Sequence, residues 1–226
     1  MREIVLDTET TGLSPKEGHR IVEIGCLELI NHISTGRNYH QYIKPDIPMP
    51  SAAQDVHGLS DEFLSDKPPF EEIGDAFLDF VGDSPMVIHN ASFDMAFINA
   101  ELTRMGREAL PMSQSIDTVS MAREKFPGAP ASLDALCRRF SIDNSARTFH
   151  GALLDAELLA EVYLELIGGR QPGLVLDMAA ARQSRQEGGT RVQRESRPPR
   201  PHAPSEEELA RHREFLEKIN DPLWDR

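Results

Sequence analysis

The 226-residue sequence is poor in cysteine, in aromatic side chains and in basic charge. Its two cysteines, Cys26 and Cys137, both lie in apolar segments. Such a pair predicts buried thiols in a reducing compartment rather than a disulfide, so we expect a cytoplasmic protein. No apolar run approaches the roughly 20 residues that span a bilayer. The sequence therefore argues against a transmembrane helix, and we expect no membrane partner.

Basic residues are outnumbered, and the acidic excess is confined to one part of the chain. The sequence carries 24 Lys and Arg against 37 Asp and Glu, a formal net charge of −13. Residues 1–170 hold 14 basic and 27 acidic side chains, whereas residues 171–226 hold 10 of each. Nucleic-acid binding normally depends on Lys and Arg that neutralise phosphates, so the acidic part is unsuited to strong unaided binding. It suits a site for divalent cations, or a subunit to which a partner delivers the substrate.

Hydrophobic patterning predicts an α/β domain over residues 1–170. Three apolar segments joined by short connections favour antiparallel strands, and strands and helices alternate after them. The expected strands lie at residues 4–6, 21–30, 37–43, 86–88 and 115–119, and the expected helices at 70–81, 93–105, 132–140 and 152–167. This order predicts a mixed five-stranded sheet with helices on its faces.

The composition changes after the last of these helices. Residues 182–204 hold six Arg and four Pro with almost no apolar side chains, which is typical of a disordered linker, placed here at 177–203. A helical pattern returns over residues 204–226, where Ser205 and Glu208 match a capping box. One short helix cannot bury a core of its own, so we expect this segment to bind a partner.

Four acidic residues are candidates for a metal site. Asp7 and Glu9 stand two apart at the end of the first strand, so both face the same side. Asp94 and Asp155 lie on the apolar stripes of their helices, and burial of an unpaired charge costs several kcal/mol. Salt bridges to Lys or Arg, or a solvated strand end, are the alternatives. With so few basic residues in the domain, four inward acids favour Mg²⁺ or Mn²⁺, which prefer oxygen ligands.

His150 is a candidate general base. Five residues of helix turn through about 500°, so His150 and Asp155 cannot share a face if both are helical. Gly151 between them allows His150 to lie in the preceding loop and turn toward the acids. A structural histidine is the ordinary alternative. Its position beside an inward acid favours proton transfer, since the pKa of histidine is close to neutral pH.

Three short segments that contain these residues resemble the exonuclease motifs of the DEDDh family. They are DTETTGL from Asp7, HNASFD from His89 and HGALLD from His150, and their order and separation also match. The resemblance covers residues 1–167 and implies a ribonuclease H-like fold and a 3′→5′ exonuclease that uses two divalent metal ions. Residue by residue, it implies that the metal ligands are Asp7, Glu9, Asp94 and Asp155. It implies that the general base is His150.

The same resemblance suggests residues that contact the substrate. It implies that the 3′ end of the strand lies near Thr8, Thr11 and His57, the last within a Val56-His57-Gly58 element similar to one in the family. A loop-capping role is an equal alternative for His57. Phe93 could stack on a base, although core packing is the more ordinary use of such a side chain.

The residues after the domain separate two branches of this family, the RNA-processing exonucleases and the proofreading epsilon subunits of bacterial DNA polymerase III. Residues 171–176 resemble a sliding-clamp-binding motif, through Gln171, Leu174 and Leu176. Residues 204–226 resemble the segment with which epsilon subunits bind the polymerase (alpha) subunit. Its apolar anchors are Leu209, Leu216, Leu223 and Trp224.

Together these resemblances imply an enzyme that removes mispaired nucleotides from a primer 3′ end and releases nucleoside 5′-monophosphates. Its expected partners are the DNA primer end, the alpha subunit and the sliding clamp, with a small accessory subunit as a further candidate. A stand-alone DEDDh exonuclease that acts on RNA or in DNA repair is the alternative. A scaffold without activity is a second alternative, which the intact acids and His150 argue against.

Overall fold

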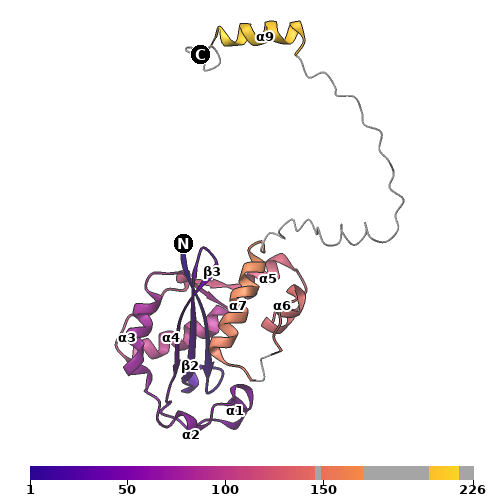
Figure 1. Cartoon of the computed structure of the whole chain (residues 1–226). Helices are drawn as coiled ribbons and strands as arrows, with labels where there is room; N and C mark the ends of the chain where they lie inside the picture. The colour runs from indigo at the N-terminus through magenta and orange to yellow at the C-terminus, as the bar shows by residue number, and fades with distance from the viewer. Residues whose placement is uncertain (146–148, 170–203, 219–226) are drawn as a thin grey trace, which may run out of the picture. The chain divides into compact units, whose positions relative to one another are not determined.

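The computed structural model describes residues 1–145, 149–169 and 204–218 (Figure 1). The chain divides into two compact units, Met1–Leu174 and Val175–Arg226. Several residues predicted to bind partners lie outside the described residues, and so does the linker predicted at 177–203. They are Gln171, Leu174, Leu176, Leu223 and Trp224.

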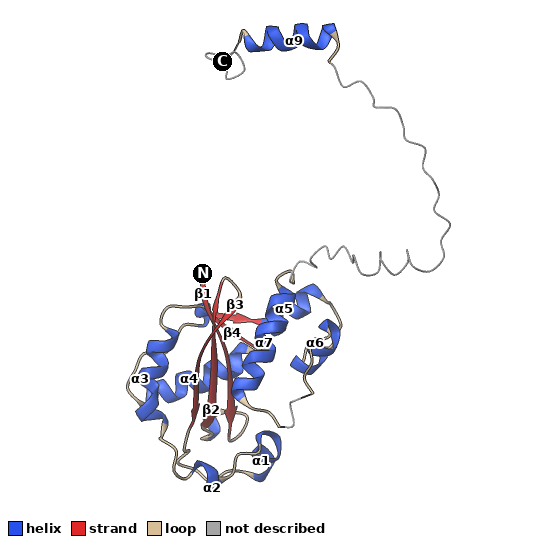
Figure 2. Cartoon of the chain, in the orientation of Figure 1, coloured by secondary structure: helices blue, strands red, loops and turns tan. Residues whose placement is uncertain are grey.

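A mixed five-stranded sheet forms the centre of the first unit, as the sequence predicts (Figure 2). Its order is β3-β2-β1-β4-β5. The strands are β1 (Arg2–Thr10), β2 (Ile21–Ile30), β3 (Ile33–Tyr42), β4 (Met86–Ile88) and β5 (Ser115–Asp117). Strand β1 pairs antiparallel with β2 and parallel with β4. The sheet therefore changes from antiparallel to parallel pairing at β1, the strand that carries Asp7 and Glu9.

Helices cover both faces of this sheet. They are α1 (Ser51–His57), α2 (Asp61–Leu64), α3 (Phe70–Val81), α4 (Ala91–Arg104), α5 (Thr118–Lys125), α6 (Leu133–Phe140) and α7 (Ala152–Leu166), with 3₁₀ turns at Pro15–Glu17 and Met112–Gln114. Ile4 and Leu6 of β1 pack with the buried residues of α3 and α4, whereas Val5 packs with those of α6 and α7. The alternation of side chains along β1 therefore supplies both cores.

Several element boundaries differ from the sequence predictions. Strand β3 begins at Ile33 rather than at residue 37, and α4 begins at Ala91 rather than at residue 93. The fifth strand ends at Asp117 instead of residue 119, because the Asp117 carboxylate accepts a hydrogen bond from the Val119 amide and starts the unpredicted helix α5. Helices α1 and α2 were also unpredicted, and they are too short to give a clear periodic pattern.

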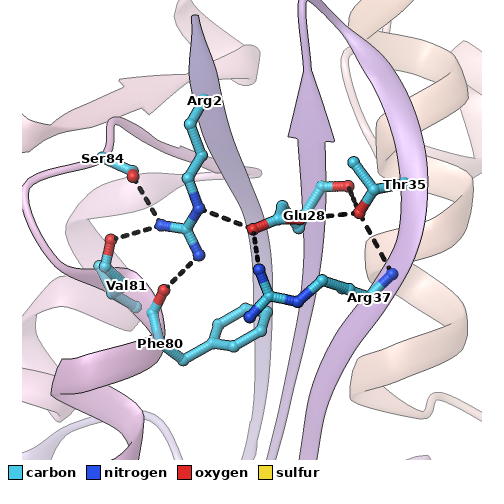
Figure 3. Close-up of polar contacts among 7 residues, drawn as sticks. All are labelled: Arg2, Glu28, Thr35, Arg37, Phe80, Val81 and Ser84. Atoms are coloured by element: carbon cyan, nitrogen blue, oxygen red, sulfur yellow. Dashed lines mark hydrogen bonds and ion pairs between the residues drawn. The ribbon is translucent and has the colours of Figure 1, made fainter.

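A buried carboxylate ties the outer end of the sheet to helix α3 (Figure 3). The Glu28 carboxylate accepts hydrogen bonds from Arg2 at 2.7 Å, Thr35 at 2.9 Å and Arg37 at 2.9 Å. The Arg2 guanidinium also donates to the Phe80 carbonyl at 2.6 Å, near the end of α3. Hydrogen bonding by Arg2 holds the pKa of Glu28 below its usual range.

The prediction of buried thiols is confirmed, since Cys26 and Cys137 are both buried and neither is paired in a disulfide. Burial raises the pKa of the Cys26 thiol, so it is held in its neutral form. Among the residues that the structure describes, no helix combines the length and the apolar character needed to cross a membrane.

The second unit is described over residues 204–218 and contains helix α9 (Glu206–Leu216). The predicted capping box is confirmed. The Ser205 hydroxyl accepts from the Glu208 amide at 3.3 Å, and the Glu208 carboxylate accepts from the Ser205 amide at 2.8 Å. Leu209 is 40% exposed and Phe215 is 60% exposed. The helix therefore has a capped N-terminus and presents apolar side chains to solvent.

Helix α7 approaches the sheet closely at Gly25 of β2. A Cβ atom built on Gly25 would lie 2.3 Å from the carbonyl carbon of Ala152, the first residue of α7. Gly25 is the partner of Asp7 in the β1–β2 pairing. The absent side chain therefore lets the helix that carries Asp155 begin directly over the strands that carry the other acids.

We predict that Gly25→Ala destabilises the folded domain by about 1–3 kcal/mol, because strand and helix must separate to admit the methyl group. Urea unfolding measures the change. Gly151→Ala is the matched control, since Gly151 has an extended φ of −147° and an added Cβ atom meets nothing within 4 Å. Equal unfolding midpoints for the two variants would contradict the close-approach explanation.

Candidate active site

A cavity of about 280 Å³ lies where the end of β1 meets the beginnings of three helices. Its lining comes from all three predicted motifs and from the start of α6, and consists of Asp7, Thr8, Glu9, His89, Phe93, Asp94, Ser132, Leu133, Asp134, His150 and Asp155. Five of these side chains are carboxylates, and none of the described lining residues is Lys or Arg.

Strand β1 distributes its polar residues between the two sides of the sheet. Thr8 follows Ile4 and Leu6 in the alternation, and its hydroxyl donates a 2.7 Å hydrogen bond to Asp94 of α4. Asp7 and Glu9 follow Val5 toward α7, the helix that carries Asp155. The acids of β1 thus lie in the same cavity as acids from two helices.

Asp94 is an acid of this cavity whose pKa is strongly raised. It is 3% exposed, and burial raises the pKa of its carboxyl group to about 7. The hydrogen bond from Thr8 opposes this effect, and the negative charge of Asp117 adds to it. A bound cation would reverse the balance, because it favours the ionised form.

Glu9, His150 and Asp155 form the tightest group in the site, since one potential ligand atom from each lies within 4.8 Å of the others. The Nδ1 atom of His150 lies 3.3 Å from Oδ2 of Asp155. The His150 amide donates to the carbonyl of Val56 at 3.2 Å, which holds this residue in the loop before α7. Glu9 and Asp155 are buried and offer the carboxylate oxygens that hard divalent cations prefer, and the His150 imidazole lies exposed beside them.

Two residues predicted to contact the substrate do not line the cavity. Thr11 is 1% exposed, and its hydroxyl accepts a 2.9 Å hydrogen bond from the Arg20 amide. His57 is 5% exposed, and its Nδ1 atom accepts from the Leu59 amide at 3.0 Å, which is the loop-capping contact that the sequence left as an alternative. Burial lowers the pKa of His57, and the nearby Glu23 and Thr10 backbone oppose that shift. Thr8 and Phe93 do line the cavity.

Sequence reasoning missed Asp134 and Ser132, which line the cavity from the start of α6. Asp134 accepts a 3.1 Å hydrogen bond from Asn144. An acid in the first turn of a helix is ordinary, because it complements the helix dipole. Its position in the sequence therefore gave no separate signal of a functional role.

Comparisons with known proteins agree with this geometry. Residues 4–163 match the model of a family described as Exonuclease. Among solved structures, Exonuclease X in complex with 5′ overhanging duplex DNA has a TM-score of 0.58 and 25% identity, and covers 73% of this chain and 90% of its own. The nuclease domain of 3′hExo, a DEDDh family member bound to rAMP, has a TM-score of 0.63 at 17% identity, with 74% and 91% covered. The chain belongs to the exonuclease family, and its fold is that of the DEDDh nucleases.

Similarity to curated proteins extends through the whole chain. DNA polymerase III subunit epsilon of Rickettsia conorii is 50% identical over 231 residues, which cover 97% of this chain and 96% of the relative. The protein of the same name from Escherichia coli is 44% identical over 228 residues, with 96% and 93% covered. Among exonucleases, therefore, this chain belongs to the family of DNA polymerase III epsilon subunits.

The raised pKa of Asp94 predicts a pH-dependent stability in the absence of metal. A carboxyl group whose folded pKa lies above its unfolded value of 3.8 destabilises the fold progressively as pH rises from about 4 to about 7. Asp94→Asn removes this titration. We expect the metal-free variant to be more stable than the parent at pH 7.5, on the order of 2–4 kcal/mol, and to lose that advantage near pH 4.

Thermal unfolding in chelator across this pH range measures the difference. The matched control is Asp79→Asn, an exposed acid on α3 that should give no pH-dependent difference. A constant offset between Asp94→Asn and the parent at every pH would assign the effect to packing instead of ionisation.

Proposed function

We propose that this chain is the proofreading 3′→5′ exonuclease of a bacterial replicative DNA polymerase, acting in the cytoplasm. It would remove mispaired nucleotides from the primer 3′ end as nucleoside 5′-monophosphates. The observation that carries the proposal is the convergence of Asp7, Glu9, Asp94, Asp155 and His150 on one cavity, in a chain that is 50% identical over nearly its whole length to an epsilon subunit.

Two divalent metal ions, Mg²⁺ or Mn²⁺, are the proposed cofactors. The residues that would hold them are Asp7, Glu9, Asp94 and Asp155, and the absence of Lys and Arg among the described lining residues supports this assignment. When bound, such ions stabilise negative charge on a phosphoryl group and lower the pKa of water. The Thr8 hydroxyl orients Asp94 through its 2.7 Å hydrogen bond. The protein thus contributes fixed carboxylates on two helices and one strand.

His150 is the proposed general base. It lies in a loop, its side chain is 48% exposed, and its ring is beside Asp155, so it can accept a proton from water at the cavity mouth. Proton transfer by a positioned histidine contributes about 10²–10⁴-fold in rate. Asp155 would stabilise the imidazolium that results.

The primer end is proposed to occupy the mouth of the same cavity. Phe93 lies there and packs on Phe97 with ring centroids 5.0 Å apart, which leaves it partly exposed to stack on a base. Thr8 would lie beside the 3′ end. Thr11 and His57 would act through the loops that they hold, since both side chains are buried.

We predict that Asp7→Ala and Asp155→Ala each abolish release of nucleoside monophosphates from a 3′-labelled oligonucleotide in Mg²⁺. Loss of one carboxylate removes a ligand and also relieves repulsion, so the metal-free variants should be at least as stable as the parent. His150→Gln should slow the reaction at least about 100-fold, the lower end of the contribution of a general base.

Asp79→Ala is the matched control for charge and should keep full activity. Near-normal activity in Mg²⁺ would remove the altered residue from the proposed ligand set. Loss of activity together with loss of the thermal transition would leave that variant uninformative on its own, so Asp7→Asn, which conserves volume, is measured beside it.

The C-terminal part is proposed to deliver the enzyme to its substrate. Residues 204–226 would bind the polymerase alpha subunit, residues 171–176 the sliding clamp, and residues 177–203 would link these sites, with a small accessory subunit as a further candidate partner. The supporting observation is α9, a capped helix whose Leu209 and Phe215 are exposed. Two tethered contacts raise the effective concentration of the nuclease at the primer end, which would offset the weak hold of an acidic domain on DNA.

We predict that deletion of residues 204–226 abolishes co-purification with the alpha subunit and leaves hydrolysis of free oligonucleotides intact. Leu209→Ala should weaken binding by about 1–2 kcal/mol if this side chain is an anchor. Arg211→Ala is the control for Leu209→Ala, because Arg211 lies about 200° around α9 from Leu209, where it pairs with Glu207. Equal alpha binding by full-length and truncated chains would favour a stand-alone exonuclease.

A further inference from the structure

A second cavity, of about 480 Å³, adjoins the active site between α5 and the start of α6. We call it the Arg123 groove. It is lined by His89, Asn90, Val119, Arg123, Ala129, Pro130, Ala131 and Ser132. His89 and Ser132 also line the active-site cavity, so the two cavities share lining residues. The two cavities are therefore immediate neighbours.

The charge of the Arg123 groove is opposite to that of the active site. None of the described residues that line it is Asp or Glu, whereas five carboxylates line the adjoining cavity. Arg123 is exposed, and within the described part of the chain its guanidinium forms no ion pair. In a domain with nearly twice as many acids as bases, a groove with a cation and no carboxylate is suited to an anion.

An acid that contacts two residues of the groove lining is already engaged in hydrogen bonds. Asp117 at the start of α5 accepts from the Val119 amide at 3.0 Å, the Ser120 hydroxyl at 2.8 Å and the Asn90 amide at 3.1 Å. These bonds lower the pKa of Asp117 and fix Asn90 against α5. Its charge is therefore spread over three donors, and the junction between β4 and α4 is held rigidly beside the groove.

The neutral lining residues offer hydrogen-bond donors. The Ser132 hydroxyl accepts from the Ala135 amide at 3.3 Å, which leaves its own proton available. The Thr118 hydroxyl donates to the Ile88 carbonyl at 3.2 Å, so the 2.9 Å contact with His89 requires Nδ1 of His89 to be the donor. His89 is thus fixed in orientation at the boundary between the two cavities.

We propose that the Arg123 groove binds the sugar–phosphate backbone of the strand on the 5′ side of the terminal nucleotide, with Arg123 contacting a phosphate. This inference rests on the proposed function and adds a binding site to it. The occupant follows from chemistry. The strand on the 5′ side of the terminal nucleotide is a chain of anionic phosphodiesters that must extend out of the active-site cavity. The Arg123 groove shares lining residues with that cavity and presents hydrogen-bond donors without carboxylates. Arg123 would then set how strongly a strand, as opposed to a single nucleotide, is held.

The test compares two substrates with the full-length protein in Mn²⁺. One is the p-nitrophenyl ester of thymidine 5′-monophosphate, which fills the active-site cavity alone, and the other is a short oligothymidylate. For Arg123→Ala we expect the ratio of the KM for the oligonucleotide to the KM for the ester to rise about fivefold, the size of one exposed charge contact. The dependence of log KM on log salt for the oligonucleotide should become shallower by about 0.7, one phosphate contact to a single strand.

Arg138→Ala removes the same charge from an exposed position on α6 that lines neither cavity, and should change neither quantity. Arg123→Glu should exceed the effect of alanine, and Arg123→Lys should restore most of the salt dependence. Equal KM ratios and equal salt slopes for Arg123→Ala and Arg138→Ala would overturn the assignment and leave the nuclease function standing. A parent chain that hydrolyses neither substrate would contradict the proposed function itself.

Discussion

Repulsion among carboxylates is the constraint on which the rest of this domain depends. Asp7, Glu9, Asp94, Asp134 and Asp155 line one cavity of about 280 Å³, and the described lining contains no Lys or Arg to neutralise them. Such an arrangement opposes folding, because each ionised group is both desolvated and close to others of its own sign. The raised pKa of Asp94 shows the desolvation part of that cost, because burial is its main cause and the charge of Asp117 adds to it. The surrounding packing must therefore be strong enough to hold the acids in place.

That packing has two parts, one on each face of the sheet. On one face, the buried aromatic side chains of α3 and α4 fix the helix that carries Asp94. On the other, α7 packs against β1 and β2, and the missing side chain of Gly25 lets its first turn approach the strands. Polar contacts far from the cavity, such as those of Glu28 with Arg2, hold the outer ends of the same elements. The carboxylate-lined cavity thus lies where these two packed layers meet.

Much of this fold and site was predictable because the signals were local or carried by recognisable motifs. The helix over residues 70–81 has a strong apolar stripe, and its boundaries were predicted correctly. Contacts between distant residues were not predictable. The Thr8–Asp94 hydrogen bond joins residues 86 apart in the chain, and the buried Thr11 hydroxyl accepts from the Arg20 amide. Helix α5 was missed because it depends on capping by Asp117 directly after a strand.

The alternation of side chains along β1 has a consequence for how this sequence can vary. Asp7 and Glu9 follow Val5 toward α7, and Thr8 follows Ile4 and Leu6 toward α4. An insertion or deletion of one residue within β1 would exchange the two sets between the faces, since the side-chain period of a strand is two. Such a change would turn an apolar side chain toward the carboxylate-lined cavity and a carboxylate toward the aromatic layer at the same time. A point substitution in β1 changes one side chain and leaves the others on their own faces. A change in the number of residues would move the side chains of this nine-residue strand to the wrong faces together.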